Sequence, residues 1–263
     1  MEDFRKYNPE GSTLRKAQLR MLDILLVVDQ IFRKHEIDYW LDGGTLLGAV
    51  RHGGFIPWDD DLDINVRNED IPRIREILQA ELPSNMAYQD FTTDSNYTLL
   101  MAKVRDRTSI FDDPHYRKCK EQGIYIDLIP MEQVVSKRIK DKIDFVYIRC
   151  LRGIHHYSDR WIERFLGYIC YPFVRMATAI CRAWIRIVPS HQMGHAYGWL
   201  SYNHIEEQYV FPTCDIKFEG YLVRAPHNPD KFLTALFGDY MQIPPENKRI
   251  THLAEITFLD EKQ

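Results

Sequence analysis

The chain has 263 residues, of which 45% are apolar, and a formal net charge of −4 at pH 7. This length and apolar content fit one large globular domain, or a domain with a substantial insertion. Five scattered cysteines, odd in number and without metal-ligand spacing, argue against a disulfide scaffold and indicate reduced thiols in a cytoplasmic protein. The N-terminal residues carry no apolar signal core, so we do not expect export.

The first predicted element is an amphipathic helix that Ser12 or Thr13 can cap and that runs to about His35. We expect it to pack on a sheet and assign it no chemistry.

Residues 39–66 carry the densest set of chemistry-bearing side chains. A short apolar strand runs into Gly43, Gly44 and Thr45, whose backbone N–H groups can face a phosphate. A short helical piece then ends at Arg51, which can offset negative charge on a substrate.

Three aspartates spaced by two, Asp59, Asp61 and Asp63, lead into a second apolar strand. Alternate residues of a strand share a face, so the three carboxylates line one face if the extended register begins that early. Carboxylates so close repel each other unless a cation lies among them, and oxygen ligands suit Mg²⁺ or Mn²⁺. The alternative is a solvated acidic loop, but the nearby glycine turn favours phosphate chemistry.

Residues 69–82 are predicted to form a second helix, and residues 99–105 a strand. On that strand Lys103 and Arg105 share a face. Either could contact a diphosphate, and Arg105 is the better candidate because arginine binds phosphate oxygens bidentately. The alternative is an ordinary surface strand.

Residues 123–131 form an apolar run bounded by Gly123 and Pro130 and containing one carboxylate, Asp127. The pattern predicts a buried strand. A lone aspartate there is costly unless it is paired, hydrogen-bonded or metal-bound. Asp127 is therefore either a satisfied structural residue or part of a site.

Residues 137–189 are aromatic, basic and helical in pattern. From 137 to 186 there are eleven basic and four acidic residues, whereas the rest of the chain has 23 basic and 34 acidic residues. Such a block indicates an anionic partner, and it lacks a nucleic-acid-binding motif. We expect two or three amphipathic helices that either pack on the core or lie on a membrane surface. His155 and His156 lack a third ligand, so we predict no zinc site there.

The last third of the chain begins with an aromatic stretch, residues 190–210, which we expect to be a partly exposed helix or a wall beside the substrate. Residues 215–226 alternate like a strand pair with a turn at Gly220. Residues 230–237 read as a short helix closed by Gly238.

The string Gly43-Gly44-Thr45-Leu46-Leu47-Gly48, then Arg51, then Ile56-Pro57-Trp58-Asp59-Asp60-Asp61-Leu62-Asp63, resembles the LicD family. Its strand, glycine turn, helix and Asp-x-Asp order also resembles the polymerase-beta type of nucleotidyltransferase fold. The resemblance resumes near the C-terminus, at Phe218-Glu219-Gly220, Gly238-Asp239-Tyr240-Met241 and Pro244-Pro245. It covers roughly residues 14–131 and 209–258 and leaves the middle unmatched.

This resemblance implies an α+β fold with a mixed sheet flanked by helices. We expect a catalytic core at 1–132, a helical insertion at 133–208 and a closing segment at 209–263. It also implies a third carboxylate, Asp127, on the strand beside Asp63, completing a metal site with Asp61 and accepting the proton of an acceptor hydroxyl. Asp59 is a further ligand or supports one.

The activity implied is metal-dependent transfer of a phospho-alcohol, typically phosphocholine from CDP-choline, to a glycan or lipid-linked glycan of lipopolysaccharide, capsule or teichoic acid. We expect a cytoplasmic protein, with peripheral contact at the inner face of the membrane through residues 137–188 and no nucleic-acid partner. The alternatives are a nucleotidyltransferase that adds a nucleoside monophosphate to a small molecule or sugar, and a non-catalytic module that binds glycan or membrane.

Overall fold

A mixed sheet lies at the centre of the computed structural model, which describes residues 4–114, 116–154, 160–199, 204–249 and 255–260. Its main path runs β1-β2-β6-β4-β3, and β7 and β8 extend it beside β6. Strands β2 and β6 are parallel, and the other neighbours are antiparallel. The strands are β1 (Tyr39–Leu41), β2 (Asp63–Arg67), β3 (Met86–Gln89), β4 (Ala102–Asp106), β6 (Tyr125–Gln133), β7 (Gln192–His195) and β8 (Ile205–Glu206). The predicted α+β class with a mixed sheet is confirmed.

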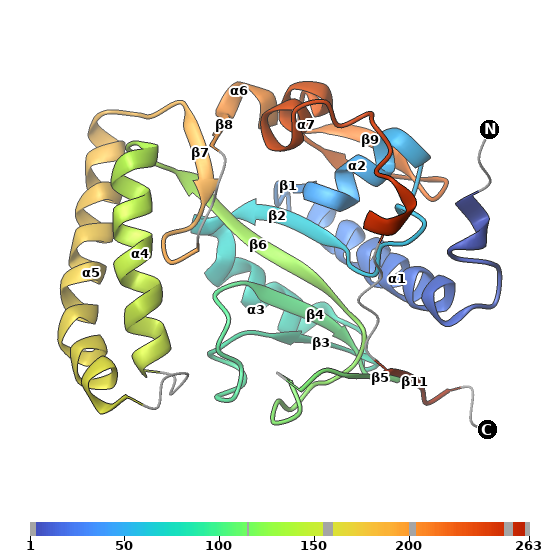
Figure 1. Ribbon diagram of the computed structural model, residues 1–263, viewed down its shortest axis with the longest axis horizontal. Coiled ribbons are helices and arrows are strands. Elements are labelled where there is room, and N and C mark those ends of the chain that lie inside the picture. The colour runs from blue at the N-terminus through green and yellow to red at the C-terminus, as the bar shows by residue number, and fades with distance from the viewer. Residues whose placement is uncertain (1–3, 115, 155–159, 200–203, 250–254, 261–263) are drawn as a thin grey trace.

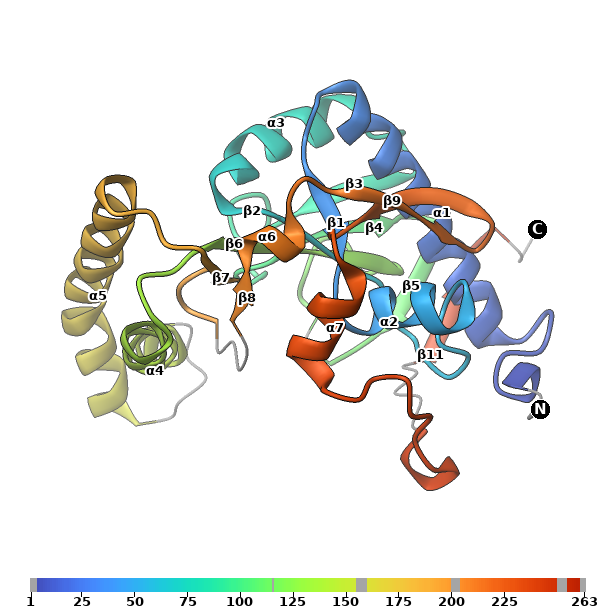
Figure 2. The ribbon, with the colours of Figure 1, turned by 90° about the horizontal axis from the view of Figure 1, so that it is seen from above.

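Two helices, α1 (Thr13–Lys34) and α3 (Ile71–Glu81), cover one face of this sheet (Figures 1 and 2). The Ser12 hydroxyl accepts a hydrogen bond from the Arg15 N–H, so the predicted N-cap of the first helix is confirmed. Ile64 and Val66 of β2 are fully buried in the hydrophobic core that α1 closes. This packing leaves Asp63 and Asn65 pointing to the opposite face, since side chains alternate along a strand.

A second layer lies over one end of the sheet and brings the C-terminal third of the chain against the glycine motif. It contains α2 (Gly43–His52), α6 (Glu207–Val210), α7 (Pro229–Phe237) and the hairpin of β9 (Cys214–Phe218) and β10 (Tyr221–Ala225). The hairpin turns at Gly220, whose φ of +89° suits glycine. The predicted strand pair and closing helix are therefore confirmed. The smaller elements are η1 (Phe4–Lys6), η2 (Asn68–Asp70), η3 (Glu246–Lys248), and β5 (Ser109–Asp112) paired with β11 (Glu255–Phe258).

The basic segment forms two long helices, α4 (Lys137–Ile154) and α5 (Trp161–Ile187), which lie beside each other at the edge of the molecule (Figures 1 and 2). The predicted helices are confirmed, while His155 and His156 lie outside the described residues. Within the described part of the chain, no helix has the length and apolar character needed to cross a bilayer.

The prediction of a helix within residues 190–210 is wrong for its first part. Gln192–His195 forms strand β7, which pairs with Met131–Gln133 of β6. Met193 is buried by this pairing, and long-range strand addition outweighs the local sequence preference.

Candidate active site

Two aspartates from neighbouring strands form the centre of the candidate site. Strands β2 and β6 run parallel with Asp63 directly beside Asp127, and the Asp127 N–H donates to the Leu62 carbonyl at 2.9 Å. Side chains at paired positions of adjacent strands project to the same face. The structure thus places Asp127 where the sequence analysis expected a third carboxylate.

Lys103 of β4 lies on the other side of Asp127 and pairs with it in register. Its ammonium lies 2.5 Å from Oδ1 of Asp127 and 3.4 Å from the centre of the Tyr125 ring, and the residue is 1% exposed. Burial lowers the Lys103 pKa, while the Asp127 charge opposes this shift. Lys103 therefore belongs to the site, where its ammonium is paired with the Asp127 carboxylate.

The acidic loop that leads into β2 adds two more carboxylates. Strand β2 begins only at Asp63, so the expected extended register across Asp59 and Asp61 is wrong. Withdrawal from water raises the Asp59 pKa to about 8, with added repulsion from Asp61 and Asp60. Burial first, and then repulsion from neighbouring carboxylates, also raises the pKa of Asp61 and of Asp63. The loop thus concentrates negative charge beside Asp127.

The N-terminus of α2 adjoins this acidic loop. Gly43 adopts φ +42°, which suits glycine, and a Cβ added at Gly44 would lie 2.9 Å from Oδ2 of Asp59. Both glycines are partly exposed, so their backbone can be approached from solvent. Thr45 is buried, and its hydroxyl accepts a hydrogen bond from the Asp63 N–H at 2.9 Å. In this arrangement Thr45 joins the helix to the strand, and the two glycines present the open helix end.

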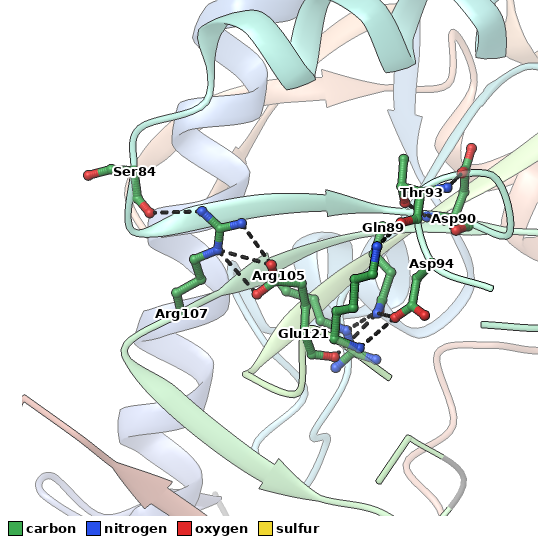
Figure 3. A network of polar contacts seen from close by, with 9 residues as sticks. Ser84, Gln89, Asp90, Thr93, Asp94, Arg105, Arg107 and Glu121 are labelled. Atoms are coloured by element: carbon green, nitrogen blue, oxygen red, sulfur yellow. Dashed lines mark hydrogen bonds and ion pairs between the residues drawn. The ribbon is translucent and has the colours of Figure 1, made fainter. Parts of the chain in front are cut away.

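Arg105, expected to contact a diphosphate, is fully buried. Its Nε donates to Oε1 of Gln89 at 2.5 Å and one Nη donates to the Gly123 carbonyl at 2.8 Å. Figure 3 shows this guanidinium within a polar network in which Gln89 in turn donates to Asp94. The expectation of a phosphate contact is therefore not met in this structure, because the buried Arg105 guanidinium donates to Gln89 and to the Gly123 carbonyl inside the fold.

Arg51 lies at the C-terminal end of α2, whereas Gly43 and Gly44 begin it. At about 1.5 Å rise per residue, the two ends of this helix are roughly 12 Å apart. The guanidinium donates to the carbonyl oxygens of Tyr240 and Gln242. Arg51 thus binds the C-terminal segment and does not lie beside the carboxylates.

Asp42 and His195 lie at the site although the sequence analysis assigned neither to it. Asp42 precedes the glycines, its N–H donates to the Asp63 carbonyl, and Oδ2 lies 3.6 Å from Nε2 of His195 on β7. The other ring nitrogen of His195 is buried and has no hydrogen-bond partner among the residues that the structure describes. The two residues are 153 positions apart, so no local pattern could have joined them.

The chemistry of the donor set fits a hard divalent cation. Asp59, Asp61, Asp63 and Asp127 offer only oxygen, which Mg²⁺ and Mn²⁺ prefer. Burial first, and then repulsion between neighbouring carboxylates, raises the pKa of the first three. As the described residues lie, no three acidic, histidine or cysteine side chains approach closely enough to make a complete metal cage.

The fold and this site define a domain of a known class. Residues 36–157 match the family described as LicD/FKTN/FKRP, nucleotidyltransferase domain. The resemblance predicted from the sequence is confirmed over this stretch.

Three relatives show how far the similarity extends. Lipopolysaccharide cholinephosphotransferase LicD of Haemophilus influenzae is 29% identical over 262 residues, which cover 94% of this chain and 98% of that protein. Uncharacterized protein RP689 of Rickettsia prowazekii is 42% identical over 77 residues, 29% of this chain and 27% of its own length. Ribitol 5-phosphate transferase FKRP of Homo sapiens is 48% identical over 48 residues, 18% of this chain and 10% of its own length.

Proposed function

We propose that this protein transfers a phospho-alcohol group from a CDP-alcohol donor, CDP-choline being the first choice, to a hydroxyl of a glycan or lipid-linked glycan. The observation that carries the proposal is the pairing of Asp63 with Asp127 beside the open end of α2. The similarity to a cholinephosphotransferase over nearly the whole chain, and to a ribitol 5-phosphate transferase over a short segment, supports this class of reaction. The similarity to these relatives does not identify the donor or the acceptor of this chain, so both belong to the proposal.

The glycine turn is the proposed seat of the donor diphosphate. The first N–H groups of a helix have no partner within the helix and carry partial positive charge, which attracts phosphate. Gly43 and Gly44 are the exposed positions where phosphate oxygens can approach that end.

Asp61 and Asp63 are the proposed ligands of Mg²⁺ or Mn²⁺, with Asp127 and Asp59 completing or supporting the set. The bound ion supplies neutralisation of the diphosphate charge. The four carboxylates would hold it. Without a compensating cation, their clustered negative charge would repel the diphosphate of the substrate.

Asp127 is the proposed acceptor of the proton from the glycan hydroxyl. The hydroxyl oxygen forms a bond to the phosphorus that carries the alcohol, the phosphoanhydride bond breaks, and CMP leaves. Lys103 holds the Asp127 carboxylate in place through their 2.5 Å ion pair. Positioning and charge neutralisation are the main contributions a protein makes to this chemistry.

The test is product analysis by mass with Mg²⁺, a panel of CDP-alcohols and candidate glycans. We expect CMP and a glycan phosphodiester, with loss of both in Asp61→Asn and Asp63→Asn. Release of pyrophosphate from a nucleoside triphosphate, with nucleotide on the acceptor, would instead establish a nucleotidyltransferase. Unchanged activity in the two asparagine variants would show that the carboxylates are structural.

A further inference from the structure

The outer face of α5 carries a continuous row of large apolar side chains in solvent. Trp161 is 71% exposed, Phe173 63% and Ile187 76%. At about 100° per residue, the row falls within about 140° of the helix circumference. It consists of Trp161, Phe165, Ile169, Phe173, Met176, Ile180, Trp184 and Ile187, and we call it the α5 stripe.

The opposite face of α5 carries small residues and packs on α4. A Cβ added at Gly167 would lie 2.9 Å from the Cys150 carbonyl oxygen, and one added at Gly153 would lie 2.5 Å from the Glu163 carbonyl oxygen. Small residues thus bring the two helices together while the large ones face outward. A helix pair made only to pack on a soluble core is expected to show the reverse distribution.

Basic side chains border the stripe along both edges. Arg164, Arg175 and Arg186 fall within about 40° of one another on the helical wheel, at one edge. At the other edge, Leu166 borders a groove of about 600 Å³ between the two helices, lined also by Arg149 and Arg152 of α4. Apolar side chains flanked by cations are typical of helices that lie in the interface of an anionic membrane.

We infer that the α5 stripe docks on the surface of an anionic lipid bilayer, with α5 lying in the plane of the interface. Trp161 and Trp184, near the two ends of the stripe, suit the headgroup region that tryptophan prefers. The charge pattern favours lipid over a second copy of the chain, because pairing two stripes would bring their arginine edges together. Docking without crossing agrees with the finding that no described helix could span a bilayer.

Helix α5 is joined to the sheet that carries the carboxylates. Arg182 of α5 forms a bidentate ion pair with Glu132 of β6 at 2.7 and 2.9 Å. Helix α5 also leads within a few residues into β7, whose His195 lies against Asp42. Membrane docking therefore fixes the orientation of the site relative to the bilayer. The inference stands on the surface alone and does not need the proposed reaction.

The first test is co-sedimentation of the whole chain with phosphatidylcholine vesicles that contain or lack phosphatidylglycerol. We expect binding to the anionic vesicles that falls with added salt, because screening shortens the reach of the arginines. Phe173→Glu/Ile180→Glu should lower the affinity for these vesicles at least tenfold, which corresponds to about 1.4 kcal/mol or more of binding free energy. Leu222→Glu, at a 61% exposed position on β10, is the matched control and should bind like the wild type.

A second pair of variants separates charge from apolar contact. Arg175→Gln/Arg186→Gln should lose the preference for phosphatidylglycerol, whereas Lys217→Gln/Lys231→Gln, on exposed positions outside α4 and α5, should keep it. Circular dichroism checks that each variant folds. Absence of vesicle binding at low salt, equal loss in Leu222→Glu, or a dimer abolished by Phe173→Glu/Ile180→Glu without lipid binding would overturn the inference.

Discussion

The Lys103 ammonium and the Asp127 carboxylate form an ion pair inside the sheet, with Nζ 2.5 Å from Oδ1 and Lys103 almost completely buried. The pair joins β4 to β6 immediately beside Asp63. Burying an unpaired charge is strongly unfavourable, so each residue offsets the cost of burying the other.

Removing one member of this pair should destabilise the protein more than removing both. We expect Lys103→Met to lower the free energy of unfolding by about 3–5 kcal/mol, because it leaves Asp127 without its partner. Lys103→Met/Asp127→Leu should recover part of that loss. Urea unfolding of the wild type, both single variants and the double variant measures the coupling, and strictly additive losses would contradict the ion pair.

Arg105 should act on stability and not on donor binding. Arg105→Lys loses the planar fork that reaches Gln89 and Gly123, and we expect a loss of roughly 1–3 kcal/mol in the free energy of unfolding. The KM for the donor should stay within about twofold of the wild type. A rise of tenfold or more in KM with unchanged stability would return Arg105 to the role of a phosphate contact.

His52 should make the protein less stable in mild acid. Burial, and then the nearby Arg51 charge, lower the His52 pKa to about 4, and the Arg51 Nε donates to the unprotonated His52 Nε2 at 3.0 Å. The unfolded chain, in which His52 has its ordinary pKa near 6.5, binds more protons between these values. The His52 contribution is therefore complete above about pH 6.5 and is lost as the pH falls towards 4.

Urea unfolding across this pH range measures the effect. His52→Gln should flatten the decline, while His227→Gln, at an exposed position, should leave it unchanged. A decline of the same steepness in His52→Gln would assign the acid sensitivity to other groups.

His195 should support the reaction through its contact with Asp42. His195→Gln keeps a polar side chain of similar reach, and we expect kcat to fall about 10–100-fold with KM for the donor little changed. His191→Gln, at an exposed position just before β7, is the matched control. Equal activity of both variants would show that the buried His195 ring only packs the edge of the sheet.

The sequence analysis was most successful where one local pattern carried the signal. The helix capped by Ser12, the strand pair around Gly220 and the lone carboxylate Asp127 in an apolar run were all readable in this way. The resemblance to a family also located the glycine turn and the acidic loop together.

The predictions that failed concern which way a side chain points and what long-range partner it finds. Arg51 and Arg105 have the right charge for phosphate, yet one binds carbonyls of the C-terminal segment and the other lies inside the fold. Lys103 and Arg105 share a strand face, so alternation could not tell which would meet Asp127. The contact of Asp42 with His195 depends on β7 pairing with β6, which no local pattern contains.

The most direct test of the account follows phosphorus from donor to acceptor. CDP-choline labelled on the phosphate that carries choline is incubated with the protein, Mg²⁺ and a glycan acceptor. The same assay is run on the Asp63→Asn variant and on Asp38→Asn, at an exposed position, as the matched control. The account predicts that this label appears in the glycan, that a label on the nucleotide phosphate remains in CMP, and that Asp63→Asn transfers neither. Nucleotide label in the glycan, or full transfer by Asp63→Asn, would contradict it.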